Sequence, residues 1–452
     1  MILDTIVALA TPSGVGAIGV IRVSGSKTIE VVNSVFKGKD LTTVSSHTIH
    51  LGTIRDGDTI VDEVLISFFK GPNSYTKEDV IEISCHGSPF IIQQLVKLLL
   101  KKGARLAKAG EFTQRAFING RFDLAQAEAV ADLIASENES MHSAAMKQMR
   151  GGFSQEIKNL REELVHFASM IELELDFGEE DVEFASRDDL KNLIGNLKTL
   201  ITRLTESFTL GNAIKNGIPT VIAGKPNAGK STLLNALLNE EKAIVSDIPG
   251  TTRDVIEDVI NVEGIAFRFT DTAGIRTTED KVEAIGVERT YAKMKEASVI
   301  IYLVDMINDS VEELQKQVDY LKDLKVPYLL IGNKMDQANP ELSVAIAKEN
   351  ALMISASQKE NLENLKEALK ELVSLDDFKT GNTIVTNLRH YESLVQTNDA
   401  LDRVITGINH QITNDFLAMD IRNSLHHLGE ITGEITTEDL LDNIFSKFCI
   451  GK

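Results

Sequence analysis

The chain has 452 residues, of which 43% are hydrophobic and 25% charged, so it holds enough apolar material for two or three folded cores. This composition excludes an intrinsically disordered or collagen-like chain. The formal net charge of −20 argues against a broadly basic protein that binds nucleic acid without regard to sequence, but it is compatible with a local basic patch.

The cysteine content and the apolar runs bear on the compartment. Only Cys85 and Cys449 occur, too few for a disulfide framework, so we expect a reducing environment. The first residues lack the basic and apolar regions of a secretory signal, and no apolar run approaches the roughly 20 residues that span a bilayer. We therefore expect a cytoplasmic protein without a membrane span.

The first half of the chain changes its pattern at residue 119. Residues 1–118 combine apolar alternations at 5–9, 19–23 and 79–83 with turn signals, which predicts an α+β domain. Residues 119–212 follow a helical pattern, because apolar residues between Ile157 and Leu175 recur every three or four positions. The acidic stretch from Asp176 to Asp189 is interpreted as a solvated turn between helices.

The second half contains an inserted unit. Residues 213–378 alternate helices with short apolar strands at 220–224, 267–270, 299–304, 328–331 and 352–355, which predicts a largely parallel sheet covered by helices. The helical pattern resumes over residues 379–452. The predicted fold is therefore multidomain, with α+β, all-α and α/β parts, and the helical domain is made from both flanks of the insertion.

The sharpest motif is a phosphate-binding loop. Residues 224–231 read Gly-Lys-Pro-Asn-Ala-Gly-Lys-Ser and lie between a predicted strand and a predicted helix. The glycines let backbone amides approach phosphate oxygens, Lys230 reaches the β and γ phosphates, and the Ser231 hydroxyl can bind Mg²⁺.

Three further motifs specify guanine. Asp271-Thr272-Ala273-Gly274 can hold the metal's water shell and present an amide to the γ-phosphate. Asn333-Lys334-Met335-Asp336 supplies a carboxylate that accepts paired hydrogen bonds from guanine. Ser355-Ala356-Ser357 ends the last strand where a backbone amide would meet the guanine oxygen. In this order and spacing, the motifs predict a Ras-like P-loop GTPase domain.

The residue that orients the attacking water is less clear. Many such enzymes have glutamine directly after the Asp-x-x-Gly motif, but Ile275 stands there and has no hydrogen-bonding group. Candidates from the following polar stretch are Arg276, Glu279, Asp280, Glu283 and Glu288. The alternative is that these residues only solvate a mobile switch and helix.

Several motifs outside the phosphate loop carry a family resemblance. They are Ala10-Thr11-Pro12-Ser13-Gly14, residues 123–129, the stretch from Ser246 to Asp254, and Phe448-Cys449-Ile450-Gly451-Lys452. Together with Asn227 they resemble the MnmE (TrmE) family of tRNA modification GTPases, in the TrmE/Era-type group of Ras-like GTPases. The resemblance runs essentially end to end.

This resemblance implies a domain plan and a reaction. The plan is an N-terminal folate-binding and dimerisation domain (1–118), a helical domain (119–212 and 379–452) and an inserted GTPase domain (213–378).

The implied protein is a homodimeric, K⁺-stimulated GTPase that joins MnmG (GidA) in a heterotetramer. It installs an aminomethyl or carboxymethylaminomethyl group at carbon 5 of the wobble uridine of certain tRNAs. A reduced folate, 5-formyltetrahydrofolate or methylenetetrahydrofolate, supplies the one-carbon unit. Because no Gly-x-Gly-x-x-Gly fingerprint is apparent, FAD would come only with the partner.

The resemblance also assigns the nucleotide and metal ligands. The implied GTP-binding residues are Asn227, Ala228, Gly229, Lys230, Ser231, Thr232, Ser246, Asp247, Ile248, Pro249, Gly250, Thr251, Thr252, Asp271, Thr272, Ala273, Gly274, Asn333, Lys334, Asp336, Ser355, Ala356 and Ser357. The implied K⁺ ligands are Asn227, Ser246, Ile248 and Thr251, and a cation there would act where other GTPases use an arginine. Ser231 and Thr252 would bind Mg²⁺, and Glu283 would position the water.

The implied folate-binding residues are Arg22, Glu82, Arg121 and Lys452. Arg22 and Glu82 are charges within apolar strands, where an isolated charge is costly unless it is paired or bound to a ligand. A carboxylate suits the pterin N–H groups, and the cationic side chains suit the folate's glutamate. The alternative is an internal salt bridge without a ligand.

A local basic run offers a candidate surface for tRNA. Between Lys101 and Arg121 the chain contains six basic residues and one acidic residue, Glu111. A solvated helix face is an equally good interpretation of this run. The bases are Lys101, Lys102, Arg105, Lys108, Arg115 and Arg121.

Cys449 admits three interpretations: a packing thiol, a lipid acceptor in a poor prenylation box, or a nucleophile that adds to carbon 6 of uridine. Its apolar neighbours Ile444, Phe445 and Phe448 favour a buried, inert thiol. Lys447 and Lys452 favour a stabilised thiolate, and we treat Cys449 as a candidate catalytic residue.

The rival function is that of a GTP-switched binding protein for ribosome assembly. It shares the GTPase motifs, but it has no need of a folate pocket, so Arg22, Glu82 and the terminal Cys-Ile-Gly-Lys argue against it.

Overall fold

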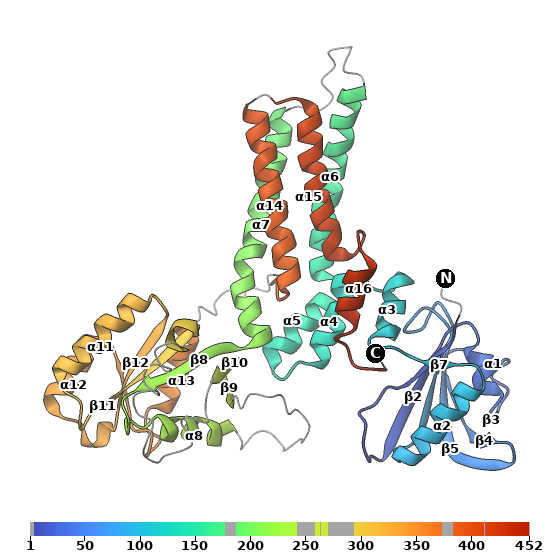
Figure 1. Ribbon diagram of the computed structural model, residues 1–452, viewed down its shortest axis with the longest axis horizontal. Coiled ribbons are helices and arrows are strands. Elements are labelled where there is room, and N and C mark those ends of the chain that lie inside the picture. Colours follow the sequence, from blue (N-terminus) through green and yellow to red (C-terminus); the bar gives the residue numbers. More distant parts are fainter. Residues whose placement is uncertain are drawn as a thin grey trace. The chain divides into compact units, whose positions relative to one another are not determined.

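The computed structural model describes residues 4–176, 187–241, 258–262, 264–269, 293–372, 383–410 and 412–451 (Figure 1). The chain forms two compact units, each made of segments that are distant in sequence. The first consists of Met1–Ala135, Ala145–Lys198 and Ser393–Lys452, and the second of Ser136–Ala144 and Thr199–Glu392. The finer division into four segments at 118, 212 and 378 stays a prediction.

A seven-stranded sheet opens the first unit. Its strands are β1 (Ile6–Leu9), β2 (Ile18–Ser24), β3 (Phe36–Lys37), β4 (Thr48–Asp56), β5 (Thr59–Phe69), β6 (Val80–His86) and β7 (Arg105–Leu106). Their order is β3-β4-β5-β6-β2-β1-β7, and all neighbours are antiparallel except β1 and β7.

One face of this sheet carries the main core, and Arg22 lies on the other face. Helices α1 (Thr28–Asn33) and α2 (Pro89–Lys101) cover the packed face with residues such as Val32 and Leu98. Because side chains alternate along a strand, Ile21 and Val23 enter the core while Arg22, between them, points to the opposite face. The register sets Arg22 directly opposite Glu82 on β6.

Helices complete the first unit. They include α3 (Glu111–Ile118), α4 (Leu124–Ile134), α6 (Gly152–Asp176), α15 (Asn414–Thr432) and α16 (Glu438–Phe445), with the first part of α7 (Arg187–Asn216) and most of α14 (Leu388–Asn409). Asp123 starts α4, since its side chain accepts a hydrogen bond from the Gln126 backbone and Gln126 reaches back to the Asp123 backbone.

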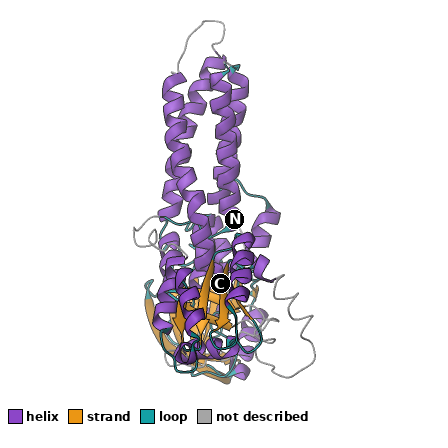
Figure 2. Cartoon of the chain, turned by 90° about the vertical axis from the view of Figure 1, so that its left-hand side faces the viewer, coloured by secondary structure: helices purple, strands orange, loops and turns teal. Residues whose placement is uncertain are grey.

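The helical segments before and after the insertion pack together, as predicted. Helix α6 buries Ile157, Leu164 and Ile171 along one face, in the predicted three- and four-residue steps. It lies beside α15, and an ion pair joins the two helices, with Arg422 Nη2 2.7 Å from Glu172 Oε1. Figures 1 and 2 show these long helices running alongside one another.

The second unit contains the predicted parallel sheet. Its strands are β8 (Ile218–Gly224), β9 (Asp258–Val262), β10 (Ile265–Phe269), β11 (Val299–Asp305), β12 (Tyr328–Asn333) and β13 (Leu352–Ile354). The order is β13-β12-β11-β8-β10-β9, and only β9 runs antiparallel to its neighbour.

Helices cover both faces of this second sheet. Helices α8 (Lys230–Glu241) and α13 (Leu362–Leu372) pack on one face, and α11 (Val311–Leu324) and α12 (Pro340–Lys348) on the other. The short helices η1 (Met335–Gln337) and α5 (Glu139–Met149) complete the described elements. Because these strands are parallel, the carboxyl ends of β8, β11, β12 and β13 lie at the same edge of the sheet. Open α/β sheets bind their ligands at this edge.

The protein combines an α+β part, a discontinuous helical part and an inserted α/β part. In the part of the chain that the structure describes, no helix is both long enough and apolar enough to cross a membrane.

Candidate functional site

The loop between β8 and α8 has the backbone that a phosphate-binding loop needs. Gly224 has φ +143° and Gly229 φ +100°, values that favour glycine, and a Cβ on Gly224 would lie 2.5 Å from the Leu303 carbonyl oxygen. Asn227 occupies the left-handed region at φ +63° and is exposed at the loop's tip. The loop is therefore a close-fitting turn of backbone in which a side chain at either glycine would be strained.

Lys230 folds back over this loop. Its Nζ donates to the carbonyl oxygens of Gly224 at 2.8 Å and Lys225 at 2.7 Å, and burial lowers the pKa of the ammonium. A cation held among backbone groups at a helix N-terminus suits an anionic phosphate. Ser231 and Thr232 follow in the first turn of α8.

Asn333 ties the phosphate loop to the last strand's loop. It is 3% exposed; its Nδ2 donates to the Ala228 carbonyl oxygen at 2.8 Å, and its Oδ1 accepts from the Ala356 backbone N–H at 3.0 Å. One side chain thus fixes two of the predicted motifs relative to each other.

The Asp336 carboxylate is held where the sequence predicts guanine contacts. The Ser355 hydroxyl donates to Asp336 Oδ1 at 2.8 Å, and this hydrogen bond holds the pKa of Asp336 below its ordinary value. The Asp336 side chain is exposed, so the ionised carboxylate can still accept from a ligand. Ser357 is exposed beside it, with its Oγ 3.3 Å from that of Ser355.

Three acids of this site escaped the sequence analysis. Asp305, the last residue of β11, pairs with Lys334 Nζ at 2.7 Å. Asp309 and Glu313 hold Lys225 Nζ at 2.8 and 2.7 Å. The available signal was an acid directly after an apolar strand, at the edge where the parallel strands end.

Several predicted site residues lie outside the described residues. They are Ser246, Asp247, Ile248, Pro249, Gly250, Thr251, Thr252, Asp271, Thr272, Ala273, Gly274, Ile275, Glu283 and Lys452. Of the residues assigned to Mg²⁺, only Ser231 is described, and of those assigned to K⁺, only Asn227.

A second group of charges gathers in the first unit. Arg22 pairs with Glu82, its Nη2 lying 2.8 Å from Oε1 and its Nε donating to the same oxygen at 2.9 Å. This is the internal salt bridge that the sequence left open. The Arg22 and Glu82 side chains are still 19% and 27% exposed, so both can reach a ligand.

Tyr75, which the sequence analysis missed, has two guanidinium groups over its ring. The Arg22 Cζ is 4.9 Å from the Tyr75 ring centre, and the Arg121 Cζ is 5.5 Å from it. Arg121 also donates to the Ser74 carbonyl oxygen. Two of the four predicted folate residues therefore lie over one aromatic ring, and a third, Glu82, pairs with one of them.

The end of the described chain reaches the same place. Ile450 forms an antiparallel bridge with Ala109, the Gly110 N–H donates to the Cys449 carbonyl oxygen at 3.3 Å, and Arg22 Nη1 donates to the Gly451 carbonyl oxygen at 3.4 Å. Gly451 has φ +98°, and a Cβ there would lie 2.2 Å from the Leu9 carbonyl oxygen.

The structure contradicts one of the three interpretations of Cys449, that of a buried packing thiol. Phe445 is 2% exposed and fills the core of the helical part, whereas the Cys449 thiol is exposed beside the tail. A packing role for this thiol is excluded.

The proposed basic surface also needs correction. Arg115 is 1% exposed and bonds to Asp4, Glu78 and Glu111, so it cannot face RNA. Arg105 binds Asp4 and Glu111 as well. Lys101, Lys102 and Lys108 are exposed, although Lys101 lies 3.6 Å from Asp56.

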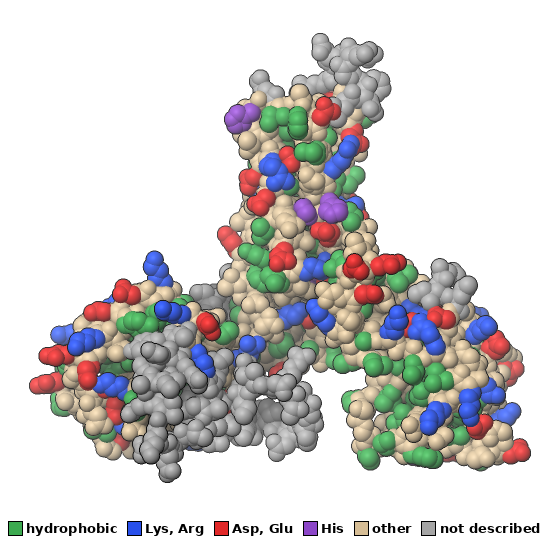
Figure 3. Space-filling model, in the orientation of Figure 1, with side chains coloured by type: hydrophobic (Ala, Val, Ile, Leu, Met, Phe, Trp, Pro, Cys, Tyr) green, Lys and Arg blue, Asp and Glu red, His purple; other side chains and the backbone are tan. Residues whose placement is uncertain are grey.

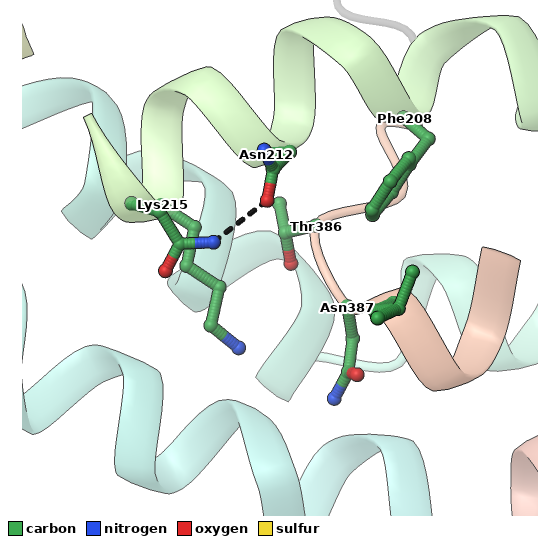
Figure 4. A pocket seen from close by; sticks show the side chains of 7 residues that line it. Phe208, Asn212, Lys215, Thr386 and Asn387 are labelled. Carbon is green, nitrogen blue, oxygen red and sulfur yellow. Dashed lines mark hydrogen bonds between the residues drawn. The ribbon is translucent and has the colours of Figure 1, made fainter. Parts of the chain in front are cut away.

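A pocket of about 440 Å³ lies between the last turns of α7 and the segment that leads into α14 (Figure 4). Asn216 Nδ2 donates to Asn212 Oδ1 at 2.7 Å on its wall. Its lining residues are Phe208, Asn212, Lys215, Asn216, Thr386, Asn387 and Leu388, and none of them is a predicted site residue.

Comparison with known proteins decides the family. Residues 5–121 match the family model of the GTP-binding protein TrmE N-terminus, and residues 124–449 match that of the MnmE helical domain. A tRNA modification GTPase MnmE of Cytophaga hutchinsonii is 60% identical over 450 residues, which is 99% of this chain and 98% of the relative. The MnmE of Flavobacterium johnsoniae is 54% identical over 463 residues, 99% of each chain.

The chain belongs to the MnmE family. Like its relatives, it is a GTPase that acts in tRNA modification, and this assignment replaces the rival function in ribosome assembly. Among solved structures, the G domain of the T. maritima FeoB iron transporter is 22% identical, covers 35% of this chain and 99% of its own, and gives a TM-score of 0.26. A TM-score this low supports no structural conclusion.

Proposed function

We propose that this MnmE-family protein is a K⁺-stimulated GTPase that modifies carbon 5 of the wobble uridine in certain tRNAs, with a reduced folate as one-carbon donor. The modification is an aminomethyl or carboxymethylaminomethyl group. The observation that carries the proposal is a cluster in which Arg22 and Arg121 lie over the Tyr75 ring while Arg22 also pairs with Glu82 and donates to the Gly451 carbonyl. These groups belong to a protein that also has a guanine-nucleotide site.

The donor set around Tyr75 fits a folate. Glu82 presents a carboxylate to the amino and ring N–H groups of a pterin, and the Tyr75 ring offers an aromatic face. Arg22, Arg121 and Lys452 supply cations for the folate's glutamate carboxylates. When bound, 5-formyltetrahydrofolate or methylenetetrahydrofolate supplies the one-carbon unit.

The residues of the nucleotide site fit GTP. Lys230 offers a half-buried cation to the phosphates, and Asp336 offers an ionised carboxylate to the base. Ser231 and Thr252 would hold Mg²⁺, and Asn227 with Ser246, Ile248 and Thr251 would hold K⁺. Glu283 would position the attacking water, because Ile275 has no hydrogen-bonding group.

The proposal includes partners. The protein acts as a homodimer in the cytoplasm, and MnmG (GidA) joins it in a heterotetramer and brings the FAD. The tRNA is the substrate. The exposure of Cys449 next to the tail supports a role for this thiol in the modification step.

The test compares Arg22→Gln with Arg55→Gln, a matched change on β4 of the same sheet. Cells that carry only Arg22→Gln should lose the modified wobble nucleoside, and the purified variant should lose binding of 5-formyltetrahydrofolate while it still hydrolyses GTP. Arg55→Gln should retain all three properties. Normal wobble-uridine modification in cells that lack this protein would refute the proposal.

A further inference from the structure

Two histidines and a glutamate share the surface of α15. They are His426, His427 and Glu430, and their side chains are 51%, 24% and 33% exposed. A helix turns about 100° per residue, so Glu430 lies between the two histidines when the helix is viewed along its axis. Figure 3 shows histidine side chains at the surface of the helical part.

The three side chains are spaced as metal ligands are. His426 Nε2 lies 3.5 Å from Glu430 Oε1, and His427 Nδ1 lies 3.2 Å from Glu430 Oε2. All three ligand atoms lie within 4.8 Å of one another. In a tetrahedral zinc site with bonds of about 2.0 Å, neighbouring ligand atoms are about 3.3 Å apart.

The surroundings favour a cation. Helix α15 ends at Thr432, so the site lies in the last turns, where the carbonyl groups carry partial negative charge. Arg422, one turn before the site, pairs with Glu172, and Arg161 of α6 pairs with Glu434. Both arginines thus already have a carboxylate partner.

We propose that His426, His427 and Glu430 bind a divalent transition-metal ion such as Zn²⁺. Two imidazole nitrogens and one carboxylate oxygen suit Zn²⁺, Co²⁺, Ni²⁺ or Cu²⁺, whereas Mg²⁺ and Ca²⁺ prefer oxygen ligands. Three protein ligands leave a coordination position for water. The ion joins successive turns of α15 and stabilises the end of this helix. This site is separate from the nucleotide and folate sites and does not rest on the proposed function.

Calorimetric titration of the full chain with ZnCl₂ tests the site directly, after treatment with a chelator. A Cys449→Ser background keeps the exposed thiol from taking up the ion. His427→Gln and Glu430→Gln should each weaken binding by about tenfold or more, because loss of even an indirect partner of a metal ligand typically costs that much. His410→Gln removes another exposed histidine, directly after α14, and should bind Zn²⁺ as the parent does.

A second measurement guards against misfolded variants. Zn²⁺ should raise the thermal unfolding temperature of the parent and of His410→Gln, and it should not do so in His427→Gln or Glu430→Gln. Millimolar Mg²⁺ should not displace the ion. Equal Zn²⁺ binding by the parent and His427→Gln, or no binding by the parent, would overturn the proposal.

Discussion

At the scale of single residues, Asn333 joins two loops of the nucleotide site, the phosphate-binding loop and the loop after β13. Replacing it with alanine leaves the Ala228 carbonyl and the Ala356 N–H without this partner in a buried place, and each such group costs about 1–3 kcal/mol. We therefore expect Asn333→Ala to bind fluorescent GDP at least about tenfold more weakly, since 1.4 kcal/mol is a factor of ten. Gln315→Ala, an exposed change on α11, should bind normally. Unchanged affinity in Asn333→Ala would show that the two loops hold their places without this side chain.

The buried Arg115 network predicts a pH dependence of stability. Burial alone would raise the pKa of Glu111, but hydrogen bonds from Arg105, the Lys108 backbone and Arg115 outweigh it and hold the pKa below its ordinary 4.5. A carboxyl whose pKa is lowered by folding stabilises the folded state fully above its ordinary pKa. That stabilisation is lost as the pH falls through the lower folded value.

We expect the free energy of unfolding of the first unit to fall as the pH drops below 4.5. Asp4 contributes in the same direction, because its pKa is also lowered. Urea unfolding at a series of pH values measures this. Glu111→Gln removes the titrating group and should flatten the curve. A variant with the same pH dependence as the parent would exclude Glu111 as its source.

At the scale of elements, α7 offers an internal comparison between two glycines. A Cβ on Gly211 would lie 2.0 Å from the Val385 carbonyl oxygen, whereas a Cβ on Gly195 meets nothing within 4 Å. Gly195→Ala should therefore stabilise the protein by up to about 1 kcal/mol, through helix propensity alone. Gly211→Ala should destabilise it by roughly 1–3 kcal/mol, because backbone must move apart. Urea unfolding checks both, and equal effects at the two positions would contradict the close approach at Gly211.

The sequence predicted those elements whose pattern reflects burial. The apolar strands around the nucleotide site and the buried face of α6 were predicted because their side chains are buried, which leaves a clear apolar pattern in the sequence. Strands β4 and β5 were missed, since one face of each is open and apolar residues such as Ile49, Leu51 and Leu65 stay exposed there. Their pattern therefore does not separate a core face from a solvent face.

The candidate site divides in the same way. Lys230, Asn333 and Asp336 were found because short motifs place them by local sequence. Asp305 and Tyr75 were missed because their roles arise from residues far away in the chain, and no local pattern marks such a contact. The local sequence left the burial of Cys449 open, because its aromatic neighbour Phe445 turns inward while Cys449 itself stays exposed.

At the scale of the whole molecule, the two compact units predict separate responses to ligands. In the proposed function, GDP with Mg²⁺ would contact groups of the second unit, and 5-formyltetrahydrofolate would contact groups of the first. A ligand at 100 times its dissociation constant stabilises the unit that binds it by about 2.7 kcal/mol. Scanning calorimetry should therefore show that each ligand raises one unfolding transition and leaves the other in place. A shift of both transitions by either ligand alone would mean that the units unfold together.

The contact between Arg22 and the Gly451 carbonyl joins residues 429 positions apart, and this separation has a consequence during synthesis. At about 5–20 residues per second, a ribosome adds Gly451 roughly 20–90 seconds after Arg22. During this interval the nascent chain contains Arg22 and Glu82 but not the Gly451 carbonyl to which Arg22 donates. A chain that terminates before Gly451 would lack this hydrogen bond to Arg22, so we expect the proposed one-carbon chemistry only in chains translated through Gly451.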